Sequence, residues 1–170
     1  MKTSIGLLAL AAVGGLAAAD ELPQRKPGLW EIVTQPSKPD QKPMMQRLCL
    51  DREIDAQLTR MGFQMGAEAC SKFDVHRMGS RVTLHSECTF GSSKFTSDAV
   101  MTYTGDSAYR NESHGRFNPP MMGMGETHTV QDAKWLGACP AGMQPGDAVM
   151  TDASGREVHM NMRAMLKGKP

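Results

Sequence analysis

The sequence is poor in aromatic residues: it contains two Trp, two Tyr and five Phe among 170 residues. Such a chain has little material for the aromatic platforms on which single-stranded nucleic acids stack. It also lacks an excess of either charge, because 19 Lys and Arg face 18 Asp and Glu. Without a basic field to attract phosphates, we expect neither a nucleic-acid partner nor binding to an acidic membrane surface.

The familiar catalytic motifs are absent as well. The chain contains no G-x-S-x-G, no H-E-x-x-H, no P-loop and no complete G-x-G-x-x-G. Each Ser, His and Asp stands alone in the sequence, so a catalytic triad would have to be assembled by folding. The sequence therefore favours a non-catalytic protein, with an enzyme whose site is assembled in space as a distant alternative.

Closely spaced cysteine pairs are also missing. The four cysteines, Cys49, Cys70, Cys88 and Cys139, contain no C-x-x-C spacing. Redox motifs and zinc sites made of four thiolates use such close pairs, so neither is expected. An even number of separated cysteines instead indicates structural disulfides that form in an oxidising compartment.

No apolar run in the chain is long enough to span a bilayer. Lys2 provides a positive start, residues 5–16 form a short apolar run, and three alanines at 17–19 suit cleavage by a signal peptidase. We therefore predict that residues 1–19 are a signal peptide and that the mature protein begins at Asp20. A short anchor that stays attached is the alternative interpretation.

Residues 20–170 are then long enough for a single β-rich domain, with a poorly defined C-terminal tail. The expected location is periplasmic or secreted. No cysteine follows the apolar run, so a lipid anchor is not expected, and no stable membrane anchor remains after cleavage of the signal.

The strongest pattern in the sequence is a β-hairpin between Cys70 and Cys88. Apolar and polar residues alternate on both arms of CSKFDVHRMGSRVTLHSEC, as in two strands with one buried face. Pairing Val75 with Val82 places the apolar side chains together and leaves Met78-Gly79 as a two-residue turn.

This hairpin also predicts the disulfide pairing. In the chosen register Cys70 faces Glu87, so a one-residue bulge near the open end is needed to bring Cys70 opposite Cys88. The hairpin already brings these two sulfurs close, which is the main geometric requirement for a disulfide. We predict the bridges Cys70–Cys88 and Cys49–Cys139.

A short helix is predicted just before the hairpin. Asp51 is a suitable N-cap, and apolar residues recur at helical spacing over residues 52–62. Gly62 and Gly66 are expected to end the helix.

Alternation predicts strands over most of the remaining chain. Residues 108–117 are polar on both faces and are predicted to form an edge strand, whereas the Pro- and Gly-rich residues 118–125 are predicted to form a loop. The tail has two alternatives, a small hairpin around the turn at 151–155 or a helix that includes Val158. Further strands are predicted around Trp30 and Ile32 and over residues 44–50, 95–103 and 126–137.

These elements together predict a mainly β fold. It should consist of a single curved antiparallel sheet or a partly closed barrel, with one short helix on one side and two disulfides. Trp30 and Trp135 lie on apolar strand faces and are expected to anchor the core rather than to bind a ligand.

Methionine is abundant where aromatic residues are scarce, with 15 in the chain. Thioether and imidazole ligands suit Cu(I), so two groups of these residues predict, as one alternative, a Cu(I) or Ag(I) carrier. The other interpretation is that Met fills irregular gaps in a modest core and forms an adaptable apolar surface. The first group is Met121, Met122, Met124 and His128, and the second is His159, Met160 and Met162.

The polar side of the predicted hairpin carries a further set of candidate ligands. His76 and His85 with Asp74 and Glu87 have the composition of a metal site with nitrogen and oxygen ligands. An ordinary solvated face has the same composition, and we favour that interpretation.

Several segments together resemble a family of exported bacterial proteins known as domain of unknown function 3617. The segments are KPGLWEI, the LCL around Cys49, CSKFDVHRMGSRVTLHSEC, MTYTGDS, WLGAC and the tail PGDAVM…GREVHM. The resemblance implies a signal peptide, a periplasmic or extracellular location and the same four cysteines. It implies no known activity, substrate or catalytic residue.

The sequence thus predicts an exported, non-catalytic protein that binds a small apolar ligand or an envelope protein. A curved sheet with a Met-rich apolar face and a covering helix would make an adaptable pocket or groove. No resident cofactor is expected unless the Cu(I) alternative holds.

Overall fold

One antiparallel sheet of nine strands dominates the computed structural model, which describes residues 22–36, 42–152 and 154–167. The predicted signal peptide at 1–19 lies outside the described residues. In chain order the elements are β1 (Gly28–Gln35), β2 (Met44–Leu50), α1 (Arg52–Ala69), β3 (Cys70–Met78), β4 (Arg81–Phe90), β5 (Ser93–Thr104), β6 (Ala108–Met121), β7 (Met124–Gly137), β8 (Asp147–Thr151), β9 (Glu157–Asn161) and α2 (Met162–Leu166).

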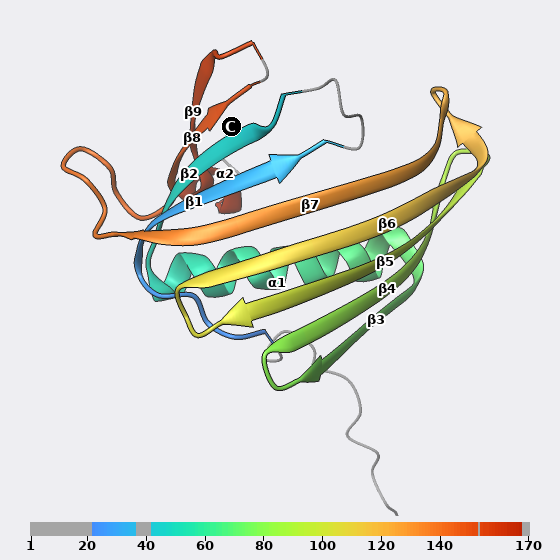
Figure 1. Ribbon diagram of the computed structural model, residues 1–170, viewed down its shortest axis with the longest axis horizontal. Coiled ribbons are helices and arrows are strands. Elements are labelled where there is room, and N and C mark those ends of the chain that lie inside the picture. The colour runs from blue at the N-terminus through green and yellow to red at the C-terminus, as the bar shows by residue number, and fades with distance from the viewer. Residues whose placement is uncertain (1–21, 37–41, 153, 168–170) are drawn as a thin grey trace, which may run out of the picture.

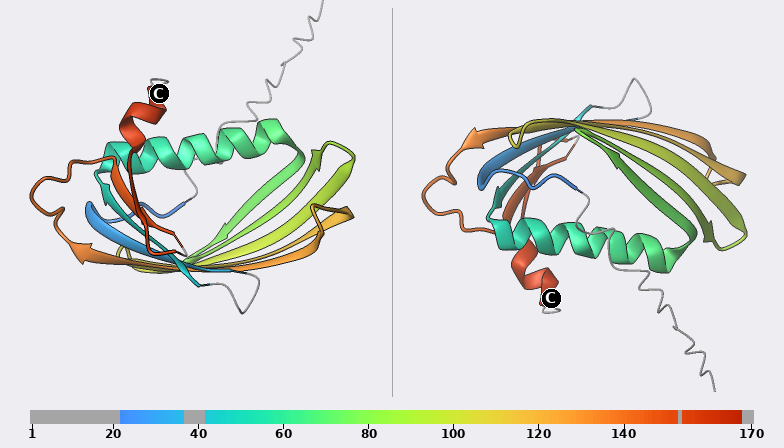
Figure 2. Two further views of the ribbon diagram at one scale, coloured as in Figure 1. Left: turned by 90° about the horizontal axis from the view of Figure 1, so that it is seen from above. Right: turned by 90° about the horizontal axis from the view of Figure 1, so that it is seen from below.

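The sheet is strongly curved and α1 lies across its concave side (Figures 1 and 2). The strand order is β3-β4-β5-β6-β7-β1-β2-β8-β9, so β3 and β9 are the two edges and the sheet does not close into a barrel. This confirms the predicted fold class of a single curved antiparallel sheet with a helix on one side.

The core forms where α1 begins, beneath β1 and β2. Alternate residues of these strands point to the concave side, and Trp30 and Leu50 are each only 1% exposed there. Ile54, in the first turn of α1, is completely buried against them. Trp30 is therefore a core anchor, as predicted, and Trp135 packs beside the same core.

The helix begins as predicted but ends later. Asp51 caps it, because its Oδ1 accepts a hydrogen bond of 2.7 Å from the backbone N–H of Ile54. The prediction that Gly62 and Gly66 end the helix is wrong. Gly66 continues the helix because the Phe73 ring of β3 packs against its Cα, where a side chain would overlap the ring.

The hairpin of β3 and β4 exists, but its register differs from the predicted one. Val75 pairs with Leu84 rather than with Val82, and the turn is Gly79-Ser80. Gly79 has φ +63°, which suits a glycine at the first position of a two-residue turn. In the observed register residues 72–77 of β3 each pair with a residue two positions further along β4 than predicted. Because side chains alternate between faces with a period of two, the same side chains still share the apolar face.

Both predicted disulfides are present. Cys70 and Cys88 are paired at the open end of the hairpin, with Cα atoms 3.9 Å apart, and Cys49 and Cys139 have Cα atoms 5.6 Å apart. The predicted bulge is also present. It lies on β3, where Ser71 is the extra residue and its hydroxyl donates a hydrogen bond to the Glu87 carbonyl.

The prediction that residues 108–117 form an edge strand is wrong, because β6 lies between β5 and β7. Residues 118–125 are not a loop either; they form the tip of the β6–β7 hairpin, where Met121 pairs with Met124. Polar residues on both faces of a strand indicate that the faces are accessible. They do not report whether its backbone is paired on both sides.

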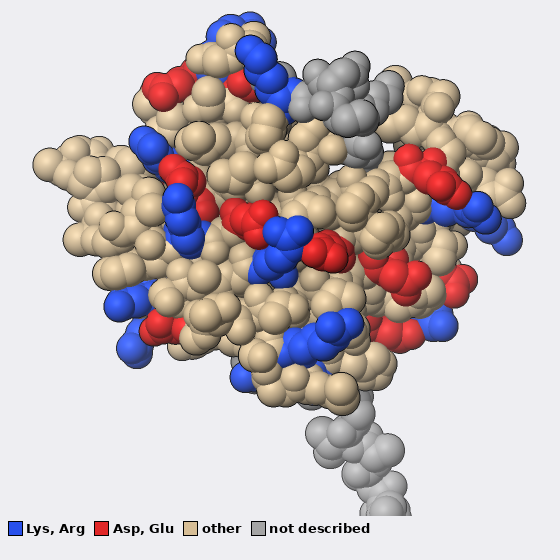
Figure 3. Space-filling model, in the orientation of Figure 1, with Lys and Arg blue, Asp and Glu red and all other residues tan. Residues whose placement is uncertain are grey.

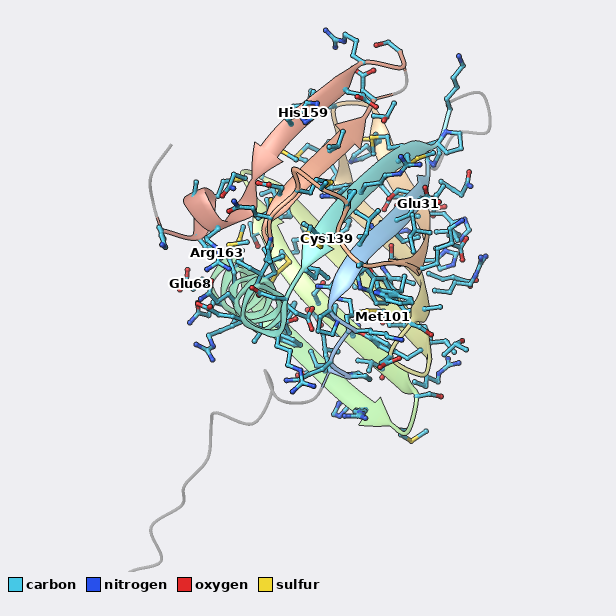
Figure 4. All side chains as sticks on the ribbon, turned by 90° about the vertical axis from the view of Figure 1, so that its left-hand side faces the viewer. Glu31, Glu68, Met101, Cys139, His159 and Arg163 are labelled. Carbon is cyan, nitrogen blue, oxygen red and sulfur yellow. A yellow bond between two sulfur atoms is a disulfide. The ribbon has the colours of Figure 1, made fainter. Side chains whose placement is uncertain are left out.

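The hairpin alternative for the tail is confirmed, and the helix that includes Val158 is not formed, because Val158 lies in β9 and the helix α2 begins only at Met162. β8 and β9 form the small hairpin, and α2 follows directly, with Met162 and Leu166 against the core. Arg163 joins α2 to the start of α1 through a 3.1 Å contact with Asp51 (Figure 4). Among the described residues, no helix is both long and apolar enough to cross a membrane.

Candidate functional site

The concave face of the sheet changes character along its strands. Near the start of α1 it carries the aromatic core. The end of the sheet with the β4–β5 and β6–β7 turns is called the distal end. Towards it, β5, β6 and β7 each contribute two small, half-buried residues to the concave face. We call these six residues the concave floor; they are Ser97, Ala99, Ser113, Gly115, Thr127 and Thr129.

The registers of β5, β6 and β7 bring the short side chains of the concave floor next to one another. Ala99 pairs with Ser113, which pairs with Thr129, so short side chains meet short side chains across the sheet. The distal half of α1 contacts β3 through the edge-to-face rings of Phe63 and Phe73, at 6.0 Å. The distal half of α1 therefore packs on β3. The concave floor, formed by β5 to β7, is only half-buried and so remains partly accessible to solvent.

Three phenylalanines form a cluster at the distal end of the concave floor. The rings of Phe95 and Phe117 lie 4.4 Å apart on paired positions of β5 and β6, and Phe90 at the end of β4 lies within 6.4 Å of both. Phe95 also covers Gly115, where a Cβ would lie only 2.5 Å from its ring. Phe90 remains 43% exposed, so this phenylalanine cluster is open to solvent.

A buried polar cluster lies at the opposite end of the concave floor. The Arg25 guanidinium donates a 2.6 Å hydrogen bond to Asp55 of α1, and both side chains are largely buried. The rings of Tyr103 and Tyr109 lie 5.6 Å apart beneath them. Burial raises the pKa of Tyr103 to about 12, so its hydroxyl stays neutral and acts as a hydrogen-bonding group rather than as a base.

Asn111 lies between this polar cluster and the concave floor. It follows Tyr109 on the same face of β6, and its Oδ1 is buried and accepts no hydrogen bond. A buried amide oxygen without a donor is costly, so it favours a water molecule or a ligand donor at this position.

The convex face of the sheet is charged but carries no patch of one sign. Figure 3 shows acidic and basic side chains side by side across it. Glu31 contacts Lys134 and Arg47 at 3.0 and 3.3 Å, and Arg110 contacts Asp132 at 2.8 Å. These pairs leave no extended field for a polyanion.

The first methionine group of the sequence forms the tip of the β6–β7 hairpin. Met121 and Met124 are directly paired, and Met122 occupies the turn with φ +50° and is 91% exposed. His128 lies on the convex face, where its ring stacks on His114 at 4.2 Å.

The second group is dispersed. His159, labelled in Figure 4, and Met160 are neighbours on β9 and so point to opposite faces of the sheet. Met162 packs against the core. β9 is separated from β7 by three strands, so the two methionine groups do not form one site. Among the described residues, no three His, Cys, Asp or Glu side chains are arranged to hold a metal ion.

The polar side of the hairpin carries hydrogen bonds and ion pairs among its own side chains and those of β5. His85 contacts Asp98 at 2.7 Å and Glu87 at 3.3 Å, and these hydrogen bonds raise the pKa of its imidazole. Asp74 contacts Lys72 at 3.7 Å, whereas His76 is exposed.

The sequence patterns did not identify the phenylalanine cluster, the buried polar cluster or the histidine stack. Each needs a strand register that local alternation leaves open. The histidine stack had no signal in the local sequence. Counted from the turn at Met122-Gly123, the residue opposite His114 would be Gln131, and only the irregularity between Arg116 and Met121 brings His128 there.

Comparison with curated proteins and with solved structures finds no match. One protein family matches, over residues 25–139, which covers β1 to β7 and all four cysteines. The tail with β8, β9 and α2, part of the resemblance noted in the sequence, lies beyond this match. Because the match covers more than half of the chain, the protein belongs to the family described as protein of unknown function DUF3617.

Proposed function

We propose that this protein is an exported, non-catalytic binding protein that holds a small apolar ligand on the concave floor, between α1 and the phenylalanine cluster. The observation that carries the proposal is the phenylalanine cluster, because it keeps large apolar rings partly exposed at the end of a face lined with small side chains. Four of the six floor residues carry a hydroxyl, so the floor and the phenylalanine cluster together combine hydrogen-bonding groups with apolar surface, as ligand sites do.

The polar cluster at the other end of the concave floor favours a ligand with one polar end. Asn111 Oδ1 would accept a hydrogen bond from a hydroxyl or amide of the ligand after a small rotation of its side chain. From Asn111 to Phe117 the strand rises by about 20 Å, which suits a single extended chain.

Export is supported by two disulfides and by the N-terminal pattern of a signal peptide. The buried polar cluster is internally paired, because Asp55 accepts a hydrogen bond from Arg25 and the Tyr103 hydroxyl stays neutral, and such a cluster suits the polar end of a binding site.

The test uses the fluorescence of N-phenyl-1-naphthylamine, a neutral apolar dye, with the purified full-length mature protein. Ser113→Trp fills the concave floor and should weaken dye binding by tenfold or more. Glu112→Trp places the same side chain on the convex face of the same strand and should leave binding unchanged. Equal binding by both variants would refute the proposed site, and melting curves must show that both variants fold.

A second candidate function rests on the β6–β7 tip. There the structure places three thioethers, Met121, Met122 and Met124, within one turn. Thioethers are soft ligands that favour Cu(I), so this tip, without the second methionine group, is a candidate site for a Cu(I) or Ag(I) carrier.

A further inference from the structure

A line of titratable side chains crosses the convex face from β3 to β7. The registers of four successive strand pairs place its members directly opposite one another, where cross-strand neighbours have Cβ atoms about 5 Å apart. The members are Asp74, His85, Asp98, His114 and His128.

The two halves of this line differ. His85 already has a carboxylate at each ring nitrogen, with Asp98 at 2.7 Å and Glu87 at 3.3 Å. His114 and His128 lie face to face, with ring centroids 4.2 Å apart and planes only 13° from parallel. Two imidazoles are thus held side by side on two rigid, central strands.

The histidine stack lies in a shallow groove of the convex face. The groove has a volume of about 660 Å³, and Asp98 borders it on one side and the ion pair of Arg116 and Glu126, at 2.7 Å, on another. Glu112, two residues before His114 on the convex face of β6, forms an ion pair with Arg110 at 2.6 Å. Carboxylates therefore surround the two imidazoles, although two of them are paired with arginines.

We propose that His114 and His128 together chelate one divalent transition-metal ion, with the tightest binding for Cu(II). Imidazole suits Zn(II), Ni(II) and Cu(II), and the general order of affinities places Cu(II) highest. This site takes nitrogen ligands and a divalent ion, so it differs from a thioether site for Cu(I) at the hairpin tip.

Chelation requires both rings to rotate about their side-chain bonds, because the nitrogen lone pairs of parallel rings do not converge on one point. Metal–nitrogen bonds of about 2.0–2.1 Å place two neighbouring ligand nitrogens about 3 Å apart. The stacked rings already lie near that spacing, and both residues are exposed, which leaves room for the rotation. The described residues provide no third converging ligand, so water, or Asp98 after a change of rotamer, completes the coordination. The paired strands hold the two imidazoles side by side, so the second bond to the ion forms at a high effective concentration, which is the chelate effect.

The test is titration of Cu(II) into the full-length mature protein, purified without a histidine tag and freed of metal. Electron paramagnetic resonance should show two nitrogen donors in the equatorial plane. His114→Ala and His128→Ala should each lower the Cu(II) affinity by roughly 10²-fold, because a single imidazole loses the chelate effect. His76→Ala, an exposed histidine of β3 outside the stack, is the matched control and should change nothing.

Two results would overturn the proposal. One is a spectrum with a single nitrogen donor in the unmodified protein, which needs no variant to fold. The other is equal loss of affinity in the His76 and His114 variants, which would mean adventitious binding to surface histidines. The site lies on the face opposite the concave floor, so failure of the dye-binding test would leave it untouched.

Discussion

At the scale of single residues, Glu31 shows how the convex face keeps a carboxylate charged. Its side chain is 11% exposed and lies between Lys134 and Arg47. The hydrogen bond from Lys134 lowers the pKa of Glu31 most, Arg47 lowers it further, and partial burial opposes both.

The lowered pKa gives a pH-dependent contribution to stability. A carboxyl whose pKa is lower in the folded state stabilises the protein fully above its unfolded pKa of about 4.3, and this contribution is lost as the pH falls through the folded value. We therefore expect Glu31→Gln to lower the free energy of unfolding by about 1 kcal/mol at pH 7 and by much less at pH 3.

Urea unfolding at both pH values measures this difference. Glu126→Gln is the control, because the Glu126–Arg116 pair is over 70% exposed and should contribute little at either pH. An equal loss at pH 7 and pH 3 in the Glu31 variant would show that the effect is not ionic.

The three methionines of the hairpin tip provide a second prediction at this scale. Replacing Met121, Met122 and Met124 together by Leu keeps the apolar volume roughly constant and removes the sulfur. If the tip binds Cu(I), this variant should lose the binding in a competition assay with a chromophoric chelator. Unchanged Cu(I) affinity would exclude the tip as a site, and Met162→Leu, in the core, is the control.

At the scale of elements, α1 contains two glycines in very different surroundings. A Cβ at Gly62 would meet nothing within 4 Å, whereas a Cβ at Gly66 would overlap the ring of Phe73. Both positions are helical, so the same substitution at each of them distinguishes the effect of helix propensity from the effect of packing.

We expect opposite effects from the same substitution at these positions. Gly62→Ala should raise the free energy of unfolding by about 0.8–1 kcal/mol, because Ala is the better helix former. Gly66→Ala should lower it by about 1–3 kcal/mol, because Phe73 must move. Urea denaturation measures both. If Gly66→Ala is as stable as Gly62→Ala, the contact between α1 and β3 is looser than described here.

The positions of the helices and strands along the chain follow closely from local patterns. Which residues pair between neighbouring strands does not. The strand over residues 44–50 and the N-cap at Asp51 were predicted as they occur, because alternation and capping depend on adjacent residues. The turn of the β3–β4 hairpin was displaced by one residue, since two registers differing by two residues bury the same face.

At the scale of the whole molecule, the two disulfides close chain loops of very different length. Cys49–Cys139 joins residues 90 apart and ties β2 to the chain just after β7, whereas Cys70–Cys88 joins residues 18 apart within one hairpin. In the chain-entropy treatment the longer loop contributes about 4.6 kcal/mol and the shorter one about 3.2 kcal/mol.

We therefore expect the double variant Cys49→Ala/Cys139→Ala to have a lower melting temperature than Cys70→Ala/Cys88→Ala. Thermal unfolding followed by circular dichroism measures both, and peptide mapping without reduction verifies the remaining bridge in each. Equal melting temperatures would contradict the entropic argument, and a peptide linking Cys49 to Cys70 would contradict the pairing itself.

The sequence by itself determined the fold class, the two disulfides and the start of the helix. Alternation and capping are properties of short segments. The Cys70–Cys88 bridge follows from a single hairpin, and it leaves Cys49 and Cys139 as the second pair.

Only the tertiary structure decided which strands are neighbours, and so which side chains meet. β6 lies inside the sheet because β5 and β7 pair with both of its edges, which its own polar sequence does not reveal. Phe90, Phe95 and Phe117 meet for the same reason, as do His114 and His128. Cross-strand contacts depend on registers set by distant turns and by packing on α1, and no local pattern contains that information.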